Sequence, residues 1–136
     1  MSRNAARPLS PHLTIWRWGP HMLVSILHRA TGVAMATGGM LLLLWWLVSL
    51  ASGEQSYATF LDCVTADEGG LNPLPMIILI GLTWVFFQHL CSGLRHFVLD
   101  TGAGYELKTN KFWATMTMVA SIAATAAIWL PTLVRF

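Results

Sequence analysis

The chain has 136 residues, of which 55% are hydrophobic and only 10% are charged, and its net charge is +2. An ordinary soluble domain carries about 25% charged residues, so this composition excludes that class. The small net charge also indicates that the chain has no nucleic-acid-binding role.

The hydrophobic residues form three long blocks, which predict three transmembrane helices within one domain over residues 1–136. The blocks cover residues 22–50, 74–99 and 112–134, and each can cross about 30 Å of hydrocarbon. A polar arm over residues 1–20 comes first and is expected to lie at the membrane interface. A soluble bundle would need polar faces that these blocks lack. The predicted fold class is an all-α membrane protein that is part of a heteromeric helical bundle.

The two connections between the blocks differ in charge, and this difference predicts the orientation. The acidic residues of the first connection are Glu54, Asp62, Asp67 and Glu68. This connection contains no basic residue and is expected to be a loop, whereas the second contains Lys108 and Lys111. The positive-inside rule places the N-terminus and the second connection in the cytoplasm. The first block starts too late and is too long for a signal-peptide core. Residues 1–10 contain arginine and no acidic residue, as in a transit peptide, but are very short for one, so a bacterial inner membrane is favoured over the mitochondrial inner membrane.

Polar side chains lie along one face of the first predicted helix. They are His21, Ser25, His28, Arg29 and Gly32. They lie at positions i, i+4, i+7, i+8 and i+11, which share one side of a helix. Charge at the edge of a membrane helix is costly and usually has a function. The simpler alternatives are helix packing by Ser25 and contact of Arg29 with lipid headgroups.

The second predicted helix has an equivalent face. It consists of His89, Ser92, Gly93, His96 and Asp100. We expect His89 to lie about 10 Å deep, with His28 nearer the membrane edge and Gly93 leaving room for a planar group beside His89. A buried neutral imidazole can bind haem iron or can join two helices by a hydrogen bond, and both alternatives stay open. In a six-coordinate haem, the second axial ligand would then come from another chain.

Two sequence motifs resemble the signatures of a known family. The first is Arg7-Pro8-Leu9-Ser10-Pro11-His12-Leu13, followed by Ser25-x-x-His28-Arg29-x-Thr31-Gly32. The second is His89-x-x-x-Gly93-Leu94-Arg95-His96-x-x-x-Asp100. Together they resemble the succinate dehydrogenase cytochrome b556 subunit family, the membrane anchor of respiratory complex II, over nearly the whole chain.

This resemblance implies a role in passing electrons from succinate to ubiquinone. His89 would be one axial ligand of haem b, with Gly93 beside the cofactor, and a second membrane anchor subunit would supply the other ligand. His28 and Arg29 would contact the haem propionates. Ser25 and Arg29 would line the ubiquinone site, where they bind a carbonyl oxygen and stabilise negative charge. An iron–sulfur subunit and a flavoprotein subunit, which oxidises succinate, would complete the enzyme.

Other functions remain as alternatives. The same chemistry in reverse would make the chain a quinol:fumarate reductase anchor, and a non-catalytic helical scaffold is possible on composition alone. A small transporter is disfavoured, because residues 40–50 and 76–85 contain almost no polar groups that could form a path across the membrane.

Overall fold

The computed structural model describes residues 16–66 and 70–135, with no account of the Arg135 side chain. Its helices are α1 (Pro20–Ala34), the π-helical segment η1 (Met35–Gly39), α2 (Met40–Ala51), α3 (Glu54–Val64), α4 (Pro73–Asp100) and α5 (Leu107–Arg135). Most of the predicted interfacial arm, including the first family motif from Arg7 to Leu13, lies outside the described residues, as do Asp67 and Glu68.

Three helices in the described part of the chain are long and apolar enough to cross a membrane. They are Pro20–Ala51, which joins α1, η1 and α2, then Pro73–Asp100 and Leu107–Val134. The prediction of an all-α protein with three spanning helices is therefore confirmed. The third helix begins five residues earlier than predicted, because the polar residues after Leu107 form its first turns.

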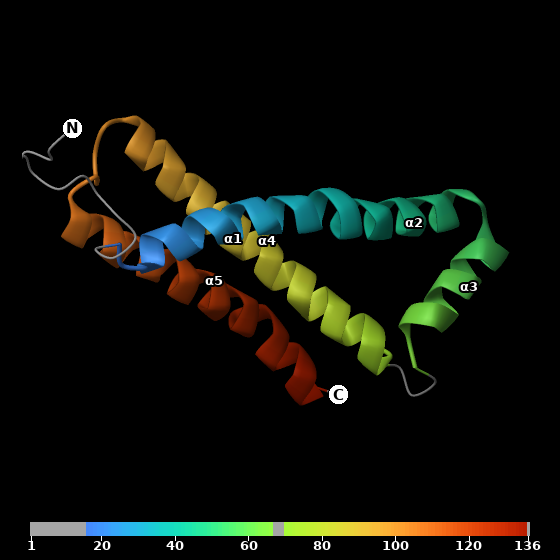
Figure 1. Ribbon diagram of the computed structural model, residues 1–136. Helices are drawn as coiled ribbons and strands as arrows, with labels where there is room; N and C mark the ends of the chain where they lie inside the picture. The colour runs from blue at the N-terminus through green and yellow to red at the C-terminus, as the bar shows by residue number, and fades with distance from the viewer. Residues whose placement is uncertain (1–15, 67–69, 136) are drawn as a thin grey trace, which may run out of the picture.

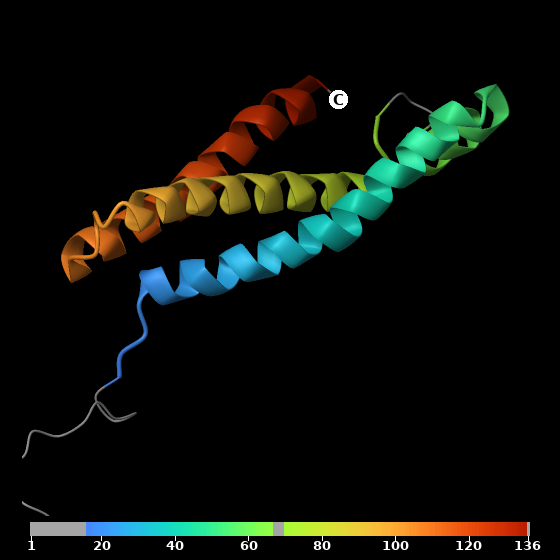
Figure 2. The ribbon, with the colours of Figure 1, turned by 90° about the horizontal axis from the view of Figure 1, so that it is seen from above.

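The helices pack against one another unevenly along their length. α4 and α5 pack together, and α1 packs against both. Beyond η1, α2 diverges from α4, and α3 spans the opening at the far end (Figure 1). Figures 1 and 2 both place the start of α1, the end of α4 and the start of α5 at one end of the molecule. This arrangement agrees with a chain that crosses three times.

The first connection is helical, so the prediction of a loop there is wrong. Gly53 has a φ of 98°, which suits glycine, and this residue redirects the chain from α2 into α3. Tyr57, Phe60 and Val64 follow at helical spacing and give α3 an apolar side. Phe60 packs edge-on against Trp45 of α2, with ring centroids 4.8 Å apart. The acidic residues of this segment obscured its apolar periodicity.

Asn72 connects the end of α3 to the start of α4. It occupies the N-cap position of α4, as predicted, but its side chain makes no capping hydrogen bond. Instead, Nδ2 donates to the carbonyl oxygens of Thr65 at 3.0 Å and Cys63 at 3.2 Å. These oxygens lie at the C-terminal end of α3, where helix carbonyls lack partners within the helix.

Buried polar side chains join α4 to α5. Gln88, Ser92 and Ser121 are fully buried. The Ser121 hydroxyl lies 2.7 Å from Gln88 Oε1, and further along the pair Trp129 Nε1 donates to Thr83 Oγ1 at 3.1 Å. In a membrane, packing and hydrogen bonds hold helices together because lipid is as apolar as the helix surface. These contacts therefore fix how α4 and α5 pack.

Candidate functional site

The histidines of α1 and α4 meet where these two helices cross. The rings of His28 and His89 are stacked, with centroids 4.0 Å apart and planes 11° from parallel. The His96 ring centroid lies 5.0 Å from that of His28. The expectation that His28 and His89 lie at different depths is wrong. His28 lies about two turns from the start of α1 and His89 about three turns from the end of α4, and the crossing of the helices aligns them.

The hydrogen bonds of His89 determine which of its ring nitrogens carries the proton. Its Nδ1 lies 3.0 Å from the backbone oxygen of His28 and 3.2 Å from Thr31 Oγ1. A carbonyl oxygen can only accept, so Nδ1 must carry the proton. A neutral imidazole has one N–H, and Nε2 therefore keeps a lone pair. This is the tautomer in which histidine commonly binds a metal through Nε2.

Ser92 makes a related contact with His28 from the opposite helix. Ser92 Oγ lies 2.8 Å from His28 Nδ1 and donates to the Gln88 backbone oxygen at 2.6 Å. Because the hydroxyl has one proton, its lone pair faces His28, and His28 Nδ1 donates to it. Two hydrogen bonds thus join α1 and α4: His89 of α4 donates to Thr31 of α1, and His28 of α1 donates to Ser92 of α4.

Two glycines allow the helices to approach at this crossing. A Cβ atom on Gly32 would lie 3.0 Å from His89 Cε1, closer than ordinary carbon contacts. A Cβ on Gly93 would instead lie 3.7 Å from His28 Cε1. The space expected beside Gly93 is therefore filled by His28, and Gly32 is the glycine that borders His89. The assignment of Gly93 to a cofactor stays a prediction.

Ser25 and Arg29 lie one turn apart on α1, near its start. Arg29 Nε donates to the backbone oxygen of Ser25 at 3.3 Å, and the Arg29 side chain is exposed. Within the described residues, Arg29 forms no ion pair and the Ser25 hydroxyl has no hydrogen-bond partner. The structure thus brings these two residues together and leaves both groups able to bind a ligand, but it does not place them in contact with His89.

Arg95 and Asp100, near the end of α4, have surroundings that are separate from the histidines. Arg95 donates to Asn110 Oδ1 on α5, so it forms a contact between the two helices. Asp100 is exposed and makes no ion pair with any residue that the structure describes. Neither residue joins the histidine cluster through a hydrogen bond of its own side chain in the described part of the chain.

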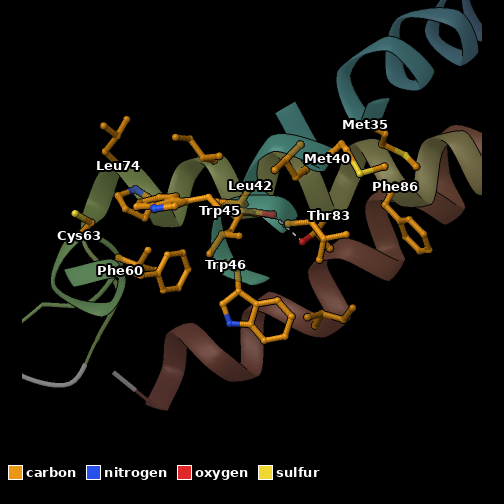
Figure 3. Close-up of a pocket in the computed structure, with 18 of the residues that line it drawn as sticks. Met35, Met40, Leu42, Trp45, Trp46, Phe60, Cys63, Leu74, Thr83 and Phe86 are labelled. Atoms are coloured by element: carbon orange, nitrogen blue, oxygen red, sulfur yellow. Dashed lines mark hydrogen bonds between the residues drawn. The ribbon is translucent and has the colours of Figure 1, made fainter. Parts of the chain in front are cut away.

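A large apolar cavity lies away from the histidines. Its volume is about 900 Å³, and it opens between α2, α3 and α4 (Figure 3). Trp45, Trp46, Phe60 and Leu74 are among its lining residues, and the polar side chains on it are limited to Thr83 and Cys63. A second cavity of about 420 Å³ lies between α4 and α5 beside Arg95. Cys63 is the one titratable side chain among the lining residues of the first cavity, whereas three histidines meet at the helix crossing, so the crossing is the candidate site.

The described residues provide no site for a bare metal ion. No cluster of three or more His, Cys, Asp or Glu residues within the described ranges could hold an ion. His89 Nε2 has a lone pair for one axial bond, and a macrocycle supplies four more nitrogen ligands. Axial ligands approach iron from opposite faces of the haem, whereas His28 and His89 are stacked face to face. These two rings therefore cannot bind the same iron in this arrangement.

Sequence reasoning missed the part played by Thr31 and the buried contact between Gln88 and Ser121. Thr31 is 2% exposed and lies three residues after His28, so its helical position alone places it beside the histidine face. Gln88 interrupts an apolar run directly before His89, and a polar residue at membrane depth is itself a signal of an interhelical partner.

The sequence matches known proteins over nearly its whole length. The family model of the succinate dehydrogenase/fumarate reductase transmembrane subunit matches residues 3–128. A succinate dehydrogenase cytochrome b556 subunit of Rickettsia felis is 34% identical over 91% of this chain and 91% of its own length. That of Paracoccus denitrificans is 35% identical over 96% of this chain and 92% of its own length. The mitochondrial cytochrome b560 subunit of Mus musculus is 29% identical over 88% of this chain and 67% of its own length.

Proposed function

The chain belongs to the succinate dehydrogenase/fumarate reductase transmembrane subunit family, and from this premise we propose that it binds haem b and ubiquinone in a succinate:ubiquinone oxidoreductase. In this role it anchors an iron–sulfur subunit and a flavoprotein subunit to the membrane, together with a second membrane anchor subunit. The dicarboxylate and flavin site is in the flavoprotein. The membrane is the bacterial inner membrane, with the N-terminus in the cytoplasm.

The observation that carries the haem assignment is the state of His89. Its Nδ1–H is held by the His28 backbone oxygen and Thr31, which leaves the Nε2 lone pair for iron. Haem, when bound, supplies a one-electron redox centre. Because His28 is stacked on His89, a histidine of the second anchor subunit would supply the other ligand. Arg29 would then bind the propionates through charge-assisted hydrogen bonds, and His28 would do so with a second proton on Nε2, since its Nδ1–H is donated to Ser92.

The ubiquinone site is assigned to Ser25 and Arg29. Reduction of ubiquinone places electrons and then protons on its two carbonyl oxygens. The Ser25 hydroxyl can donate to one of these oxygens, and the Arg29 guanidinium stabilises the negative charge that develops there. Both residues lie near the start of α1, at the end of the molecule where α4 ends and α5 begins. At the membrane edge, the isoprenoid tail stays in lipid while the head group reaches protons.

Two alternative functions differ from this proposal. A quinol:fumarate reductase anchor would carry out the reverse reaction, but the relatives compared above bear the name succinate dehydrogenase. A non-catalytic scaffold would bind no haem. A reduced-minus-oxidised spectrum of the purified complex separates the scaffold from the proposed function.

The quinone assignment is tested by replacing Ser25 in the intact complex. Ser25→Ala should lower ubiquinone reduction by about 10²–10³-fold, if the hydroxyl acts as an oxyanion donor, and spare succinate oxidation by a dye that accepts electrons upstream. Ser49→Ala is the matched control, because this hydroxyl donates to the Trp45 backbone oxygen at 2.7 Å in α2. Normal quinone turnover in Ser25→Ala would place the site elsewhere. Equal loss of dye reduction would show that the defect is not confined to the quinone step.

The haem assignment is tested separately with His89→Leu. This complex should lose or strongly perturb the low-spin haem spectrum, because no other imidazole of the described chain has the same pair of acceptors on Nδ1. A spectrum and reduction potential like those of the wild type would exclude His89 as an axial ligand.

A further inference from the structure

The Thr31 hydroxyl offers a lone pair to the His89 ring. Thr31 is buried on α1 and its Oγ1 lies 2.7 Å from the Leu27 backbone oxygen, one turn earlier. The single hydroxyl proton is therefore used within α1. His89 Nδ1, at 3.2 Å, meets the remaining lone pair of Thr31 Oγ1. Thr31 thus acts toward His89 as an acceptor.

The backbone of the same helical turn supplies a second acceptor. The His28 carbonyl oxygen lies 3.0 Å from His89 Nδ1, so the N–H is shared between this oxygen and Thr31 Oγ1. Gly32, the next residue of α1, lies so close to the ring that an added Cβ would be 3.0 Å from Cε1. The ring is therefore held by two acceptors at Nδ1 and by a close backbone contact at Cε1. Rotation of the ring would lose both hydrogen bonds.

We propose that Thr31 is a positioning residue for the haem ligand: together with the His28 carbonyl oxygen it holds the ring orientation of His89, and its lone pair strengthens electron donation from Nε2. This inference rests on the proposed function, since it requires that His89 bind the iron. Acceptors on the distal N–H of a metal-bound histidine fix its tautomer and raise its basicity. A more basic ligand stabilises the oxidised iron. Loss of the Thr31 contact should therefore raise the haem reduction potential.

The test measures the haem midpoint potential in the intact complex with Thr31→Val, Thr31→Ser and Thr37→Val. Valine keeps the shape of threonine but removes the acceptor, whereas serine keeps the hydroxyl. Thr37 is the matched control, because its hydroxyl also donates to a backbone oxygen one turn earlier, that of Val33 at 2.8 Å, and contacts no histidine among the described residues.

Thr31→Val should shift the midpoint potential upward. Outer hydrogen bonds change metal affinity by about 10–100-fold. If the ratio of affinities for oxidised and reduced iron changes about tenfold, the shift is about 59 mV for one electron. Thr31→Ser should keep the potential near that of the wild type, and Thr37→Val should leave it unchanged. A wild-type potential and spectrum in Thr31→Val would overturn the proposal.

Two further results keep the test decisive. If Thr31→Val assembles without haem, Thr31→Ser is compared with Thr31→Ala: a shift in the alanine variant alone supports the proposal, and equal potentials contradict it. His89→Leu separates this inference from the proposed function. A haem spectrum that survives His89→Leu rejects the ligand assignment itself. A spectrum that depends on His89 but has a potential insensitive to Thr31 rejects only the positioning role.

Discussion

The most direct test of the packing between α1 and α4 is the addition of one methyl group at Gly32. The new Cβ of Gly32→Ala would lie 3.0 Å from His89 Cε1 and 3.5 Å from its Nδ1. Carbon atoms pack best at about 3.5–4.0 Å, so the ring must retreat by about 0.5 Å or more. The His28 ring, stacked with centroids 4.0 Å apart, and the two acceptors on Nδ1 restrict that movement.

The expected cost follows from two opposing effects. Overpacking by one methyl group costs about 1–3 kcal/mol, whereas replacing glycine by alanine inside a helix gains about 0.5–1 kcal/mol. The net effect is therefore about 0–2.5 kcal/mol against the native arrangement of His89. Since about 1.4 kcal/mol is a factor of ten, haem affinity should fall by up to roughly 60-fold. The displaced ring should also alter the absorption spectrum of the haem that remains.

The measurement is the haem content and the reduced-minus-oxidised spectrum of the purified complex, followed by its thermal unfolding. Gly81→Ala is the control, because a Cβ at this position of α4 meets no atom within 4 Å. It should keep the haem content and spectrum of the wild type. If Gly32→Ala matches Gly81→Ala in haem content, spectrum and stability, the close contact between α1 and His89 is refuted.

Two further predictions concern the packing of the helices. Ser121→Ala should lower the stability of the complex by about 1–2 kcal/mol, since it leaves Gln88 Oε1 buried without its partner; an unchanged unfolding midpoint would contradict this. Asn72→Ala should speed hydrogen exchange in α3, because the donor to the Thr65 and Cys63 carbonyls is lost. Asn72→Asp also lacks the N–H donor and should show the same faster exchange. Hydrogen-exchange protection equal to that of the wild type in both variants would show that the Asn72 hydrogen bonds do not stabilise α3.

The sequence was sufficient to predict the spanning helices and the residues that share a face. Apolar length determines whether a helix can cross the membrane, and the 3.6-residue period determines which side chains lie together. Both properties belong to one segment at a time. Ser25 and Arg29 on α1 are therefore found together in the structure, as their spacing predicts.

The meeting of side chains from two helices could not be predicted in the same way. Their relative depth depends on where α1 crosses α4, and periodicity contains no information about that point. The estimate of depth from helix ends therefore separated His28 from His89, although their rings are stacked. The same limit hides the contact between Gly93 and His28, where an added Cβ would lie 3.7 Å from His28 Cε1. Thr31 was missed because its hydroxyl matters only once His89 lies opposite it.

The distribution of satisfied and unsatisfied groups indicates which surfaces of the chain serve its own fold and which serve binding. Between α4 and α5, and between α1 and α4, hydroxyl groups and imidazole N–H groups find partners within the chain, whereas Gln88 Nε2 and Arg95 Nε are buried without a partner among the described residues. Near the start of α1, the Ser25 hydroxyl and the Arg29 guanidinium have no side-chain acceptor among the described residues. A donor left at the membrane edge gains most from an anionic or carbonyl oxygen supplied from outside. This contrast supports a ligand site at Ser25 and Arg29 and a structural role for Ser121, although all three are polar residues in spanning helices.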